Sequence, residues 1–257
     1  MGEVPPTHPR YASLMARKRL TDAAATGMLA ESALIAHGRG EAFDYLLGER
    51  TCDAARKAIA EVAARLLSAE NPVISVNGNT VALAGPQLLT CAAMLNCPVE
   101  VNIYYRTPER MEALLSALEL QREEATILYP EFHQQISLVP ILGATPDGRI
   151  PNLDGPRANC HSDGILSADV ILVPLEDGDR CEALVAMGKT VCAIDLNPLS
   201  RTAKKATITI VDELTRCLPL LLDDLIDETL IPDENWDNEQ NLRQVVSEML
   251  RILDDAA

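Results

Sequence analysis

Acidic residues follow three short apolar segments in the second half of the sequence. The segments span residues 170–175, 190–194 and 207–211, and the sequences after them are EDGD, DLN and DEL. Uninterrupted runs of β-branched and aliphatic residues are typical of strands buried on both faces of a parallel sheet. The carboxyl ends of parallel strands meet at one edge of the sheet, where open α/β folds bind their ligands. These acidic turns therefore predict part of a binding site.

Three carboxylates lie within four positions in the first of these turns. At that spacing Glu176, Asp177 and Asp179 repel one another, so they require a counter-ion, either Mg²⁺ or the adjacent Arg180. A solvated acidic turn with Gly178 at a positive φ angle is the structural alternative. The residues alone leave both open.

The second turn carries side chains suited to a nucleotide. Asp195 stands at a strand end, where nucleotide-binding folds place an acid against the ribose hydroxyls. Arg201 and Thr202 follow a few positions later and have donors for phosphate oxygens.

The sequence His37-Gly38-Arg39-Gly40 suggests a phosphate site in the N-terminal part of the chain. Glycines on both sides of an arginine allow backbone N–H groups to converge on an anion while the guanidinium binds it. A glycine-rich turn with a solvated arginine is the alternative. The sequence lacks a G-x-G-x-x-G fingerprint and a Walker A lysine, which excludes an ordinary dinucleotide fold and a P-loop nucleotidase.

The NGN motif at residues 77–79 is a second candidate for anion binding. It follows an apolar segment and begins a predicted helix, so its backbone N–H groups and the helix dipole favour an oxyanion. A plain turn is the alternative. At the next strand end, Asn102, Tyr105 and Arg106 can add a second phosphate contact, although Arg106 is equally suited to exposed surface.

A parallel sheet is needed to bring these motifs together. Residues 73–76 and 99–103 are predicted strands joined by a helix over 81–95, and a helix over 109–120 follows the cap Thr107. With the three apolar segments, of which the first two flank a short helix, they give two βαβ units and at least five parallel strands. The predicted fold is α/β, a Rossmann-like, doubly wound and mostly parallel sheet with N-terminal and C-terminal helices.

We expect a single α/β domain over residues 1–257. Residues 1–70 form its N-terminal helical part, with helices over 11–25 and, from a cap at Thr51, over 51–68. Residues 71–222 form the sheet core and residues 223–257 a helical tail.

Two further segments lack a strand pattern. Residues 122–167 show no regular period, and their polar half is expected to close over the site or to form an interface. A helix over 235–257 carries an apolar stripe that needs a partner surface, either the protein's own sheet or a second subunit. The stripe consists of Leu242, Val245, Val246, Met249, Leu250 and Leu253.

Composition limits the class of protein. A net charge of −16 over 257 residues disfavours nonspecific nucleic-acid binding, which requires basic surface. No apolar run approaches the ~18 residues of a membrane span, and no signal peptide is recognisable, so we expect a cytoplasmic protein. The seven cysteines form no C-x-x-C pair and are expected to be small core residues.

Four sequence stretches resemble the archaeal 4-phosphopantoate–β-alanine ligase family, also called phosphopantothenate synthetase. They are LIAHGRGEAFDYLL, PVISVNGN, VPLEDGDRCEA and DLNPLSR, and the similarity covers about residues 5–222. The chain departs from the family pattern at residues 128–145, which have the character of an insertion, and after Ile231. The resemblance implies an enzyme of coenzyme A biosynthesis, a homodimer with a Rossmann-like subunit, and ATP with Mg²⁺ as the energy source.

The implied reaction joins 4-phosphopantoate to β-alanine. ATP would activate the acid as an acyl-adenylate with loss of diphosphate, and the amine of β-alanine would then displace AMP. Such chemistry needs Mg²⁺, cationic donors for phosphate charge and close positioning of two substrates.

The resemblance also implies roles for individual residues. Arg39, His37, Asp177 and Asp179 are the catalytic candidates. The implied ATP contacts are Arg17, Arg39, Asp195, Leu196, Asn197, Arg201, Thr202, Asp212 and Glu213. The implied 4-phosphopantoate contacts are His37, Asn77, Asn79, Arg106 and Arg180. Asp177 and Asp179 are candidates for Mg²⁺ or for the ammonium of β-alanine, and a kinase or a non-catalytic nucleotide-binding dimer remains an alternative.

Overall fold

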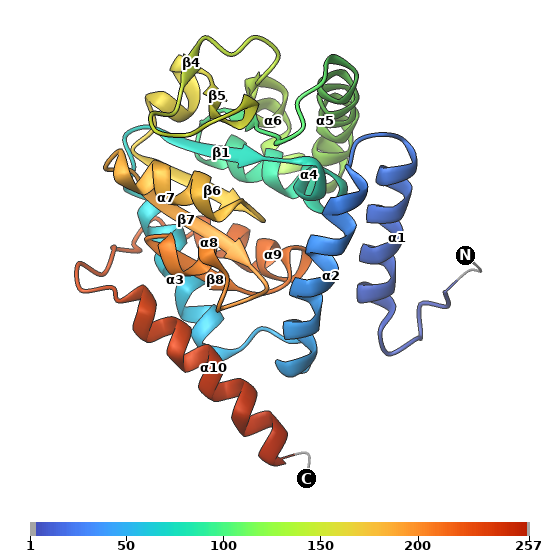
Figure 1. The fold of residues 1–257 in the computed structure, drawn as a ribbon, viewed down its shortest axis with the longest axis vertical. Coiled ribbons are helices and arrows are strands. Elements are labelled where there is room, and N and C mark those ends of the chain that lie inside the picture. Colours follow the sequence, from blue (N-terminus) through green and yellow to red (C-terminus); the bar gives the residue numbers. More distant parts are fainter. Residues whose placement is uncertain (1–3, 256–257) are drawn as a thin grey trace.

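A six-stranded parallel sheet forms the centre of the molecule. In the computed structural model, which describes residues 4–255, the strands stand in the order β3-β2-β1-β6-β7-β8 (Figure 1). They are β1 (Pro72–Val76), β2 (Val99–Val101), β3 (Ile141–Leu142), β6 (Val170–Pro174), β7 (Thr190–Asp195) and β8 (Ile208–Val211). Every pairing between them is parallel, as the uninterrupted apolar segments predicted.

The sheet is doubly wound, and its winding direction reverses between β1 and β6. From β1 the chain passes through α4 (Gly78–Met94) to β2 on one side, whereas from β6 it passes through α7 (Gly178–Ala186) to β7 on the other. Right-handed crossovers in opposite directions place the two helices on opposite faces. The carboxyl ends of β1 and β6 therefore flank a topological switch point, the usual ligand position in such folds.

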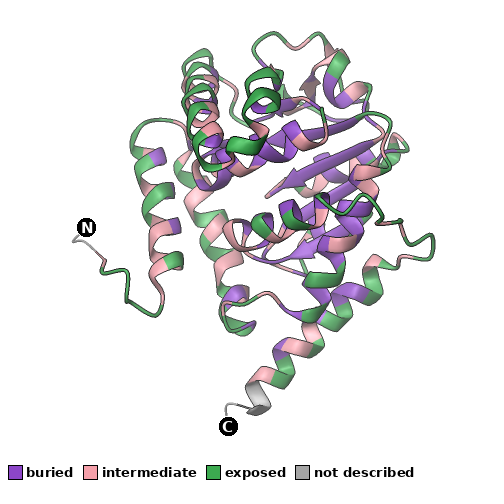
Figure 2. Cartoon of the chain, turned by 180° about the vertical axis from the view of Figure 1, so that it is seen from behind, coloured by how far each residue is buried: buried purple, intermediate pink, exposed green. Residues whose placement is uncertain are grey.

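Alternate residues of the strands enter different cores. On β6 and β7, Leu172 and Ile194 belong to the larger core, together with residues of α3 (Asp53–Leu67), α4, α5 (Pro108–Leu128) and α9 (Leu214–Leu225). Their neighbours Ile171 and Ala193 face a smaller core that α7 and residues 150–168 cover. Figure 2 shows the strands buried and the outer surfaces of the flanking helices exposed.

Two N-terminal helices lie outside the sheet edge. The arrowheads of β1 and β6 point toward α2 (Glu31–Leu46), and α1 (Tyr11–Ala25) lies beyond it (Figure 1). Residues 37–40 are part of α2, so the predicted glycine-rich anion turn is wrong. Gly40 instead permits a close approach, because a Cβ atom there would lie 3.1 Å from Cβ of Leu196.

Two predicted helix starts need a different account. The cap Thr107 precedes α5 as predicted, but the helix is longer and reaches Leu128. The cap of α3 is Cys52, whose Sγ accepts a hydrogen bond from N of Ala55, and not Thr51. Thr51 instead donates its hydroxyl to Asp212. All seven cysteines are buried, as expected of core residues.

The segment without a strand pattern folds into small pieces. It forms α6 (His133–Leu138), the edge strand β3, and a short antiparallel pair of β4 (Gly148–Arg149) and β5 (Asn159–Cys160). Buried Glu100 on β2 accepts hydrogen bonds from the backbone N–H groups of His161 and Ile165, and it thereby fixes this segment to the sheet.

The C-terminal helix α10 (Asn238–Asp255) covers the β8 side of the molecule. Leu242, Val245 and Met249 are buried in a third core that includes Leu47 and Val211, while Leu250 is 60% exposed. The stripe is thus covered largely by the protein itself, and the side chain of Leu253 lies outside the described ones. None of the helices in the described part of the chain has the length and apolar character required to cross a membrane.

Candidate functional site

A cleft of about 380 Å³ opens at the switch point, at the carboxyl ends of β1, β2 and β6. We call it the switch-point cleft. It is lined by α2 and the residues before it, and by residues 102–105 with Arg110. Its floor includes the NGN motif and residues 175–177. The predicted position of the site, at the carboxyl edge of the sheet, is thus an actual hollow.

The two faces of α2 serve two different hollows. Ala33, Ala36 and Arg39, three positions apart, line the switch-point cleft. His37 and Glu41, four positions apart, line a second cavity of about 310 Å³ between α1, α2 and the start of α9. His37 and Arg39 therefore line different cavities, although they are close in the sequence.

The second cavity is rich in charged groups. Its lining includes Glu41, Asp44, Glu49, Glu213, Arg10 and Arg216. Nε of Arg17 donates to Glu41 at 2.7 Å. Burial lowers the pKa of His37, which favours the neutral imidazole. Its buried Nδ1 has no hydrogen-bond partner among the described atoms.

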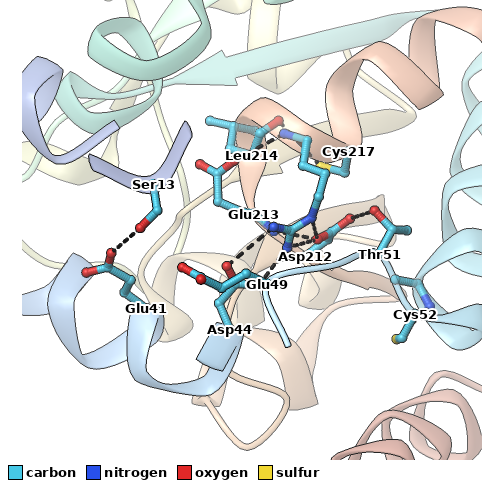
Figure 3. Close-up of polar contacts among 12 residues, drawn as sticks. Ser13, Glu41, Asp44, Glu49, Thr51, Cys52, Asp212, Glu213, Leu214 and Cys217 are labelled. Atoms are coloured by element: carbon cyan, nitrogen blue, oxygen red, sulfur yellow. Dashed lines mark hydrogen bonds and ion pairs between the residues drawn. The ribbon is translucent and has the colours of Figure 1, made fainter. Parts of the chain in front are cut away.

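Asp212 is a fully buried carboxylate at the end of β8. It accepts a hydrogen bond from Oγ1 of Thr51 at 2.6 Å and pairs with Arg216, which also pairs with Asp44 (Figure 3). Burial lowers the pKa of Arg216, but the bonds and charges of the two carboxylates outweigh this and raise it. Glu213 caps α9 through the backbone N of Arg216, and burial raises the pKa of its carboxyl.

Asn77 and Asn79 line the switch-point cleft at the end of β1, but their amides are used internally. Asn77 and Thr80 form a capping box at the start of α4, and Nδ2 of Asn77 donates to the carbonyl of Leu175 at 2.9 Å. Nδ2 of Asn79 is 3.5 Å from the carbonyl of Ala33. Leu175 has a φ of +53°, a strained conformation of the kind that concentrates at functional sites.

The three acids after β6 divide between two arginines. Glu176 forms an ion pair with Arg180, which is only 1% exposed, and Asp179 pairs with Arg157. Arg180 thus acts as the counter-ion that the sequence left open for Glu176. Asp177 lies at the cleft, with one carboxylate oxygen 3.8 Å from Arg157. Partial desolvation raises the pKa of Asp177, and the charges of Glu176 and Asp179 add to the effect.

Polar groups at the end of β7 stabilise their own turn. Asp195 accepts hydrogen bonds from N of Asn197 at 2.9 Å and from Oγ of Ser200 at 2.6 Å, and burial raises the pKa of its carboxyl. The hydroxyl of Thr202 donates to the carbonyl of Glu176. The predicted nucleotide contacts at the end of β7 are therefore adjacent in space, but most of their polar side-chain atoms already have hydrogen-bond partners.

Arg106 does not lie where it was expected, and Arg110 lines the cleft instead. Arg106 donates to the carbonyl of Gly143 and is absent from the cleft lining. Arg110, one helical turn further on, lines the cleft. The sequence contained the signal for Arg110, since an arginine in the first turn of a helix capped by Thr107 returns toward the strand end before it. Arg201 is exposed and pairs with Glu182.

A doubly wound α/β subunit with a polar cleft at its switch point is the architecture of nucleotide- and small-acid-binding enzymes. Comparison with known proteins makes the class specific. Residues 54–251 match the family described as phosphopantothenate/pantothenate synthetase, and the chain belongs to this family. The matched range encloses both residues 128–145 and most of the tail, the two regions in which a departure from the family pattern was expected.

Curated archaeal relatives carry the same name. A protein of Methanosarcina mazei is 43% identical over 97% of this chain and 95% of its own length. Proteins of Methanospirillum hungatei and Thermococcus onnurineus are each 49% identical, over 84% and 85% of this chain and 82% and 78% of their own. All three are named 4-phosphopantoate–β-alanine ligase.

Proposed function

We propose that the protein is a 4-phosphopantoate–β-alanine ligase that acts in coenzyme A biosynthesis. The observation that carries the proposal is the 43% identity, along almost the whole of both chains, to a relative of that name. The switch-point cleft supports it, because a hollow of about 380 Å³ with two arginines suits a small phosphorylated acid. We also propose that the enzyme works in the cytoplasm and as a homodimer.

The chemistry follows from the unreactive nature of a carboxylate toward an amine. In the proposed reaction, the carboxylate of 4-phosphopantoate attacks the α-phosphorus of ATP and diphosphate leaves. The nitrogen of β-alanine then attacks the mixed anhydride, a C–N bond forms, AMP leaves and one proton is released. The protein's own part is to orient the two acids and to neutralise phosphate charge.

Arg39 is the residue best placed for phosphate charge. It lines the cleft, it is exposed, and it forms no ion pair among the described residues. Because Gly40 packs against Leu196, this part of α2 is also next to the end of β7. We therefore propose that ATP lies along the ends of β7 and β8, bordered by Leu196, Asn197 and Thr202.

The remaining nucleotide candidates are proposed in supporting roles. Asp195 and Asp212 hold turns and buried ion pairs, so their proposed role is to fix the backbone that borders ATP. Arg17, Arg201 and Glu213 would contact ATP only if they exchange their present partners.

The donor set at the cleft fits a magnesium ion held partly by phosphate. Mg²⁺ is commonly bound by one or two carboxylates with substrate phosphates completing the shell. Asp177 is an exposed carboxylate that lines the cleft, whereas Asp179 is paired with Arg157. We propose Asp177 as the ligand, and the ion would supply neutralisation of phosphate charge.

One assay separates this proposal from its alternatives. The protein is incubated with ATP, Mg²⁺, 4-phosphopantoate and β-alanine, and the nucleotide products are resolved. AMP and diphosphate that appear only when both acids are present support the ligase. ADP would instead identify a kinase, and an absence of turnover would favour a non-catalytic nucleotide-binding protein.

A further inference from the structure

Arg110 is a cation of the switch-point cleft with unused hydrogen-bonding capacity. Its Nη1 donates to the carbonyl of Tyr105 at 2.7 Å and its Nη2 to the carbonyl of Met28 at 3.3 Å. The buried Nε has no partner among the described atoms. Since a guanidinium has five N–H donors, these two bonds leave others for a ligand. A buried unpaired donor is costly, so an acceptor is expected here.

The charge of Arg110 is also uncompensated. Among the described residues it forms no ion pair, and of the two acids in the cleft lining, Glu176 is already paired with Arg180. Burial lowers the pKa of Arg110, which is the effect of removing a cation from water without supplying an anion. An anionic group of a ligand in the cleft would compensate the charge of Arg110.

The two arginines reach the cleft from different parts of the sheet edge. Arg39 is next to Gly40, which packs against Leu196 at the end of β7. Arg110 is held by Tyr105, just beyond the end of β2, and β7 and β2 are separated by two strands of the sheet. A molecule with an anion at each end can therefore span the cleft, with the reacting carboxylate toward β7 and the other anion toward β2.

We infer that Arg110 binds the phosphate of 4-phosphopantoate and sets the preference for the phosphorylated acid over free pantoate. This inference rests on the proposed function and adds to it the residue that reads the phosphate. The planar guanidinium suits this task, because it can donate two parallel N–H bonds to one phosphate.

A purely structural role for Arg110 is the competing explanation, since its two carbonyl bonds tie residue 28 to residue 105. The two explanations differ in selectivity. Loss of a structural tie affects all substrates alike, whereas loss of a phosphate ligand affects only the phosphorylated acid. The test is therefore the ratio of kcat/KM for 4-phosphopantoate to kcat/KM for pantoate.

We expect Arg110→Gln to lower kcat/KM for 4-phosphopantoate on the order of 100-fold and to leave that for pantoate nearly unchanged. KM for ATP and for β-alanine should stay constant. Inorganic phosphate should compete with 4-phosphopantoate in the wild type and lose this effect in the variant. Arg110→Lys keeps the charge without the fork, so it should give an intermediate ratio, and it serves if Arg110→Gln does not fold.

Arg122→Gln is the matched control. Arg122 lies on the same helix and donates to a backbone carbonyl, that of Ile136, but it does not line the cleft. Its replacement should leave the selectivity ratio unchanged. The inference would be overturned if Arg110→Gln left the ratio unchanged, either because kcat/KM falls equally for both acids or because it falls for neither.

Failure of the proposed function gives a different result. A wild type without turnover refutes the ligase, and the phosphate site is then judged by thermal stabilisation with 4-phosphopantoate alone. Stabilisation of the wild type but not of Arg110→Gln supports the site. Equal stabilisation of both, or of neither, refutes it.

Discussion

Arg39 projects from α2 into the switch-point cleft as an exposed guanidinium without a carboxylate partner in the described chain. Its removal should spare the fold and harm the chemistry. We predict that Arg39→Ala lowers kcat by about 100- to 1,000-fold, because a donor to transition-state charge is lost. Unfolding temperature should not change. Arg19→Ala, an exposed arginine on α1, is the control, and full activity of Arg39→Ala would refute the ATP assignment.

Glu100 should make stability depend on pH in the opposite sense to a paired surface carboxylate. Burial raises its pKa from 4.5, although N–H groups of His161 and Ile165 favour the charged form. The folded state therefore binds more protons than the unfolded state above 4.5, and stability falls as pH rises through the folded pKa. Glu100→Gln should remove this part of the decline.

Urea unfolding of the wild type and of Glu100→Gln across a pH series measures how the free energy of unfolding depends on pH in each. Glu124→Gln, on the exposed side of α5, is the control and should leave the slope as it is. An identical pH slope for wild type and Glu100→Gln would contradict the prediction. The absolute stability of the Gln variant does not decide the matter, since its amide cannot accept from both backbone donors.

At the level of residues, the sequence predicted location better than role. The acids after β6, β7 and β8 are at the sheet edge, as expected from strand ends alone. Roles depend on partners distant in the sequence, which local patterns do not reveal. Asp212 is buried against Arg216 and Thr51, and Glu176 against Arg180. Arg110 is a different case, because its place in the first turn after the cap Thr107 is a local signal for the strand end.

Helix α4 contains a break that a distant side chain repairs. Ala84 has non-helical φ and ψ angles before Pro86, and Nε2 of Gln121 donates to the carbonyl of Val81 at 2.8 Å. A Cβ atom on Gly85 would lie 1.8 Å from Oε1 of Gln121. We predict that Gly85→Ala destabilises the protein by about 1–3 kcal/mol in urea unfolding.

Two comparisons test this explanation. The double variant Gly85→Ala/Gln121→Ala should be less destabilised than the sum of the single variants, because the clash is gone. Gly38→Ala, inside α2 with no atom within 4 Å of the new Cβ, should instead stabilise by about 0.5–1 kcal/mol. Strict additivity in the double variant would show that the clash is not the cause.

At the level of elements, regular periodicity was sufficient to predict helices and strands, whereas segments without it could not be predicted. Strands β1, β2, β6, β7 and β8 and helix α1 follow directly from apolar runs and helical spacing. The glycines of residues 37–40 do not form the predicted turn, because they lie within α2. Gly40 serves packing instead, since it allows α2 to approach Leu196. Residues 122–167 are held by tertiary bonds to Glu100, so their short strands leave no local pattern.

At the level of the whole molecule, the winding order explains why the motifs converge. The chain reverses its direction across the sheet between β1 and β6, and the NGN and EDGD motifs follow these two strands. Two βαβ units could be predicted from sequence, but their relative order in the sheet could not. That order creates the cleft, and α2 lines it.

The proposed homodimer has a candidate surface along α10. A groove of about 880 Å³ lies between α10 and residues 198–206, with Leu199 54% exposed at its wall. We predict that the protein has twice the 27.9 kDa mass of one chain in light scattering, with a second copy seated on this groove. Leu199→Asp combined with Val246→Asp should give monomers, because charges cannot be buried at an apolar contact. Leu120→Asp, at a position that is 70% exposed on α5, should leave the dimer intact. A dimer that survives the double variant would place the interface elsewhere.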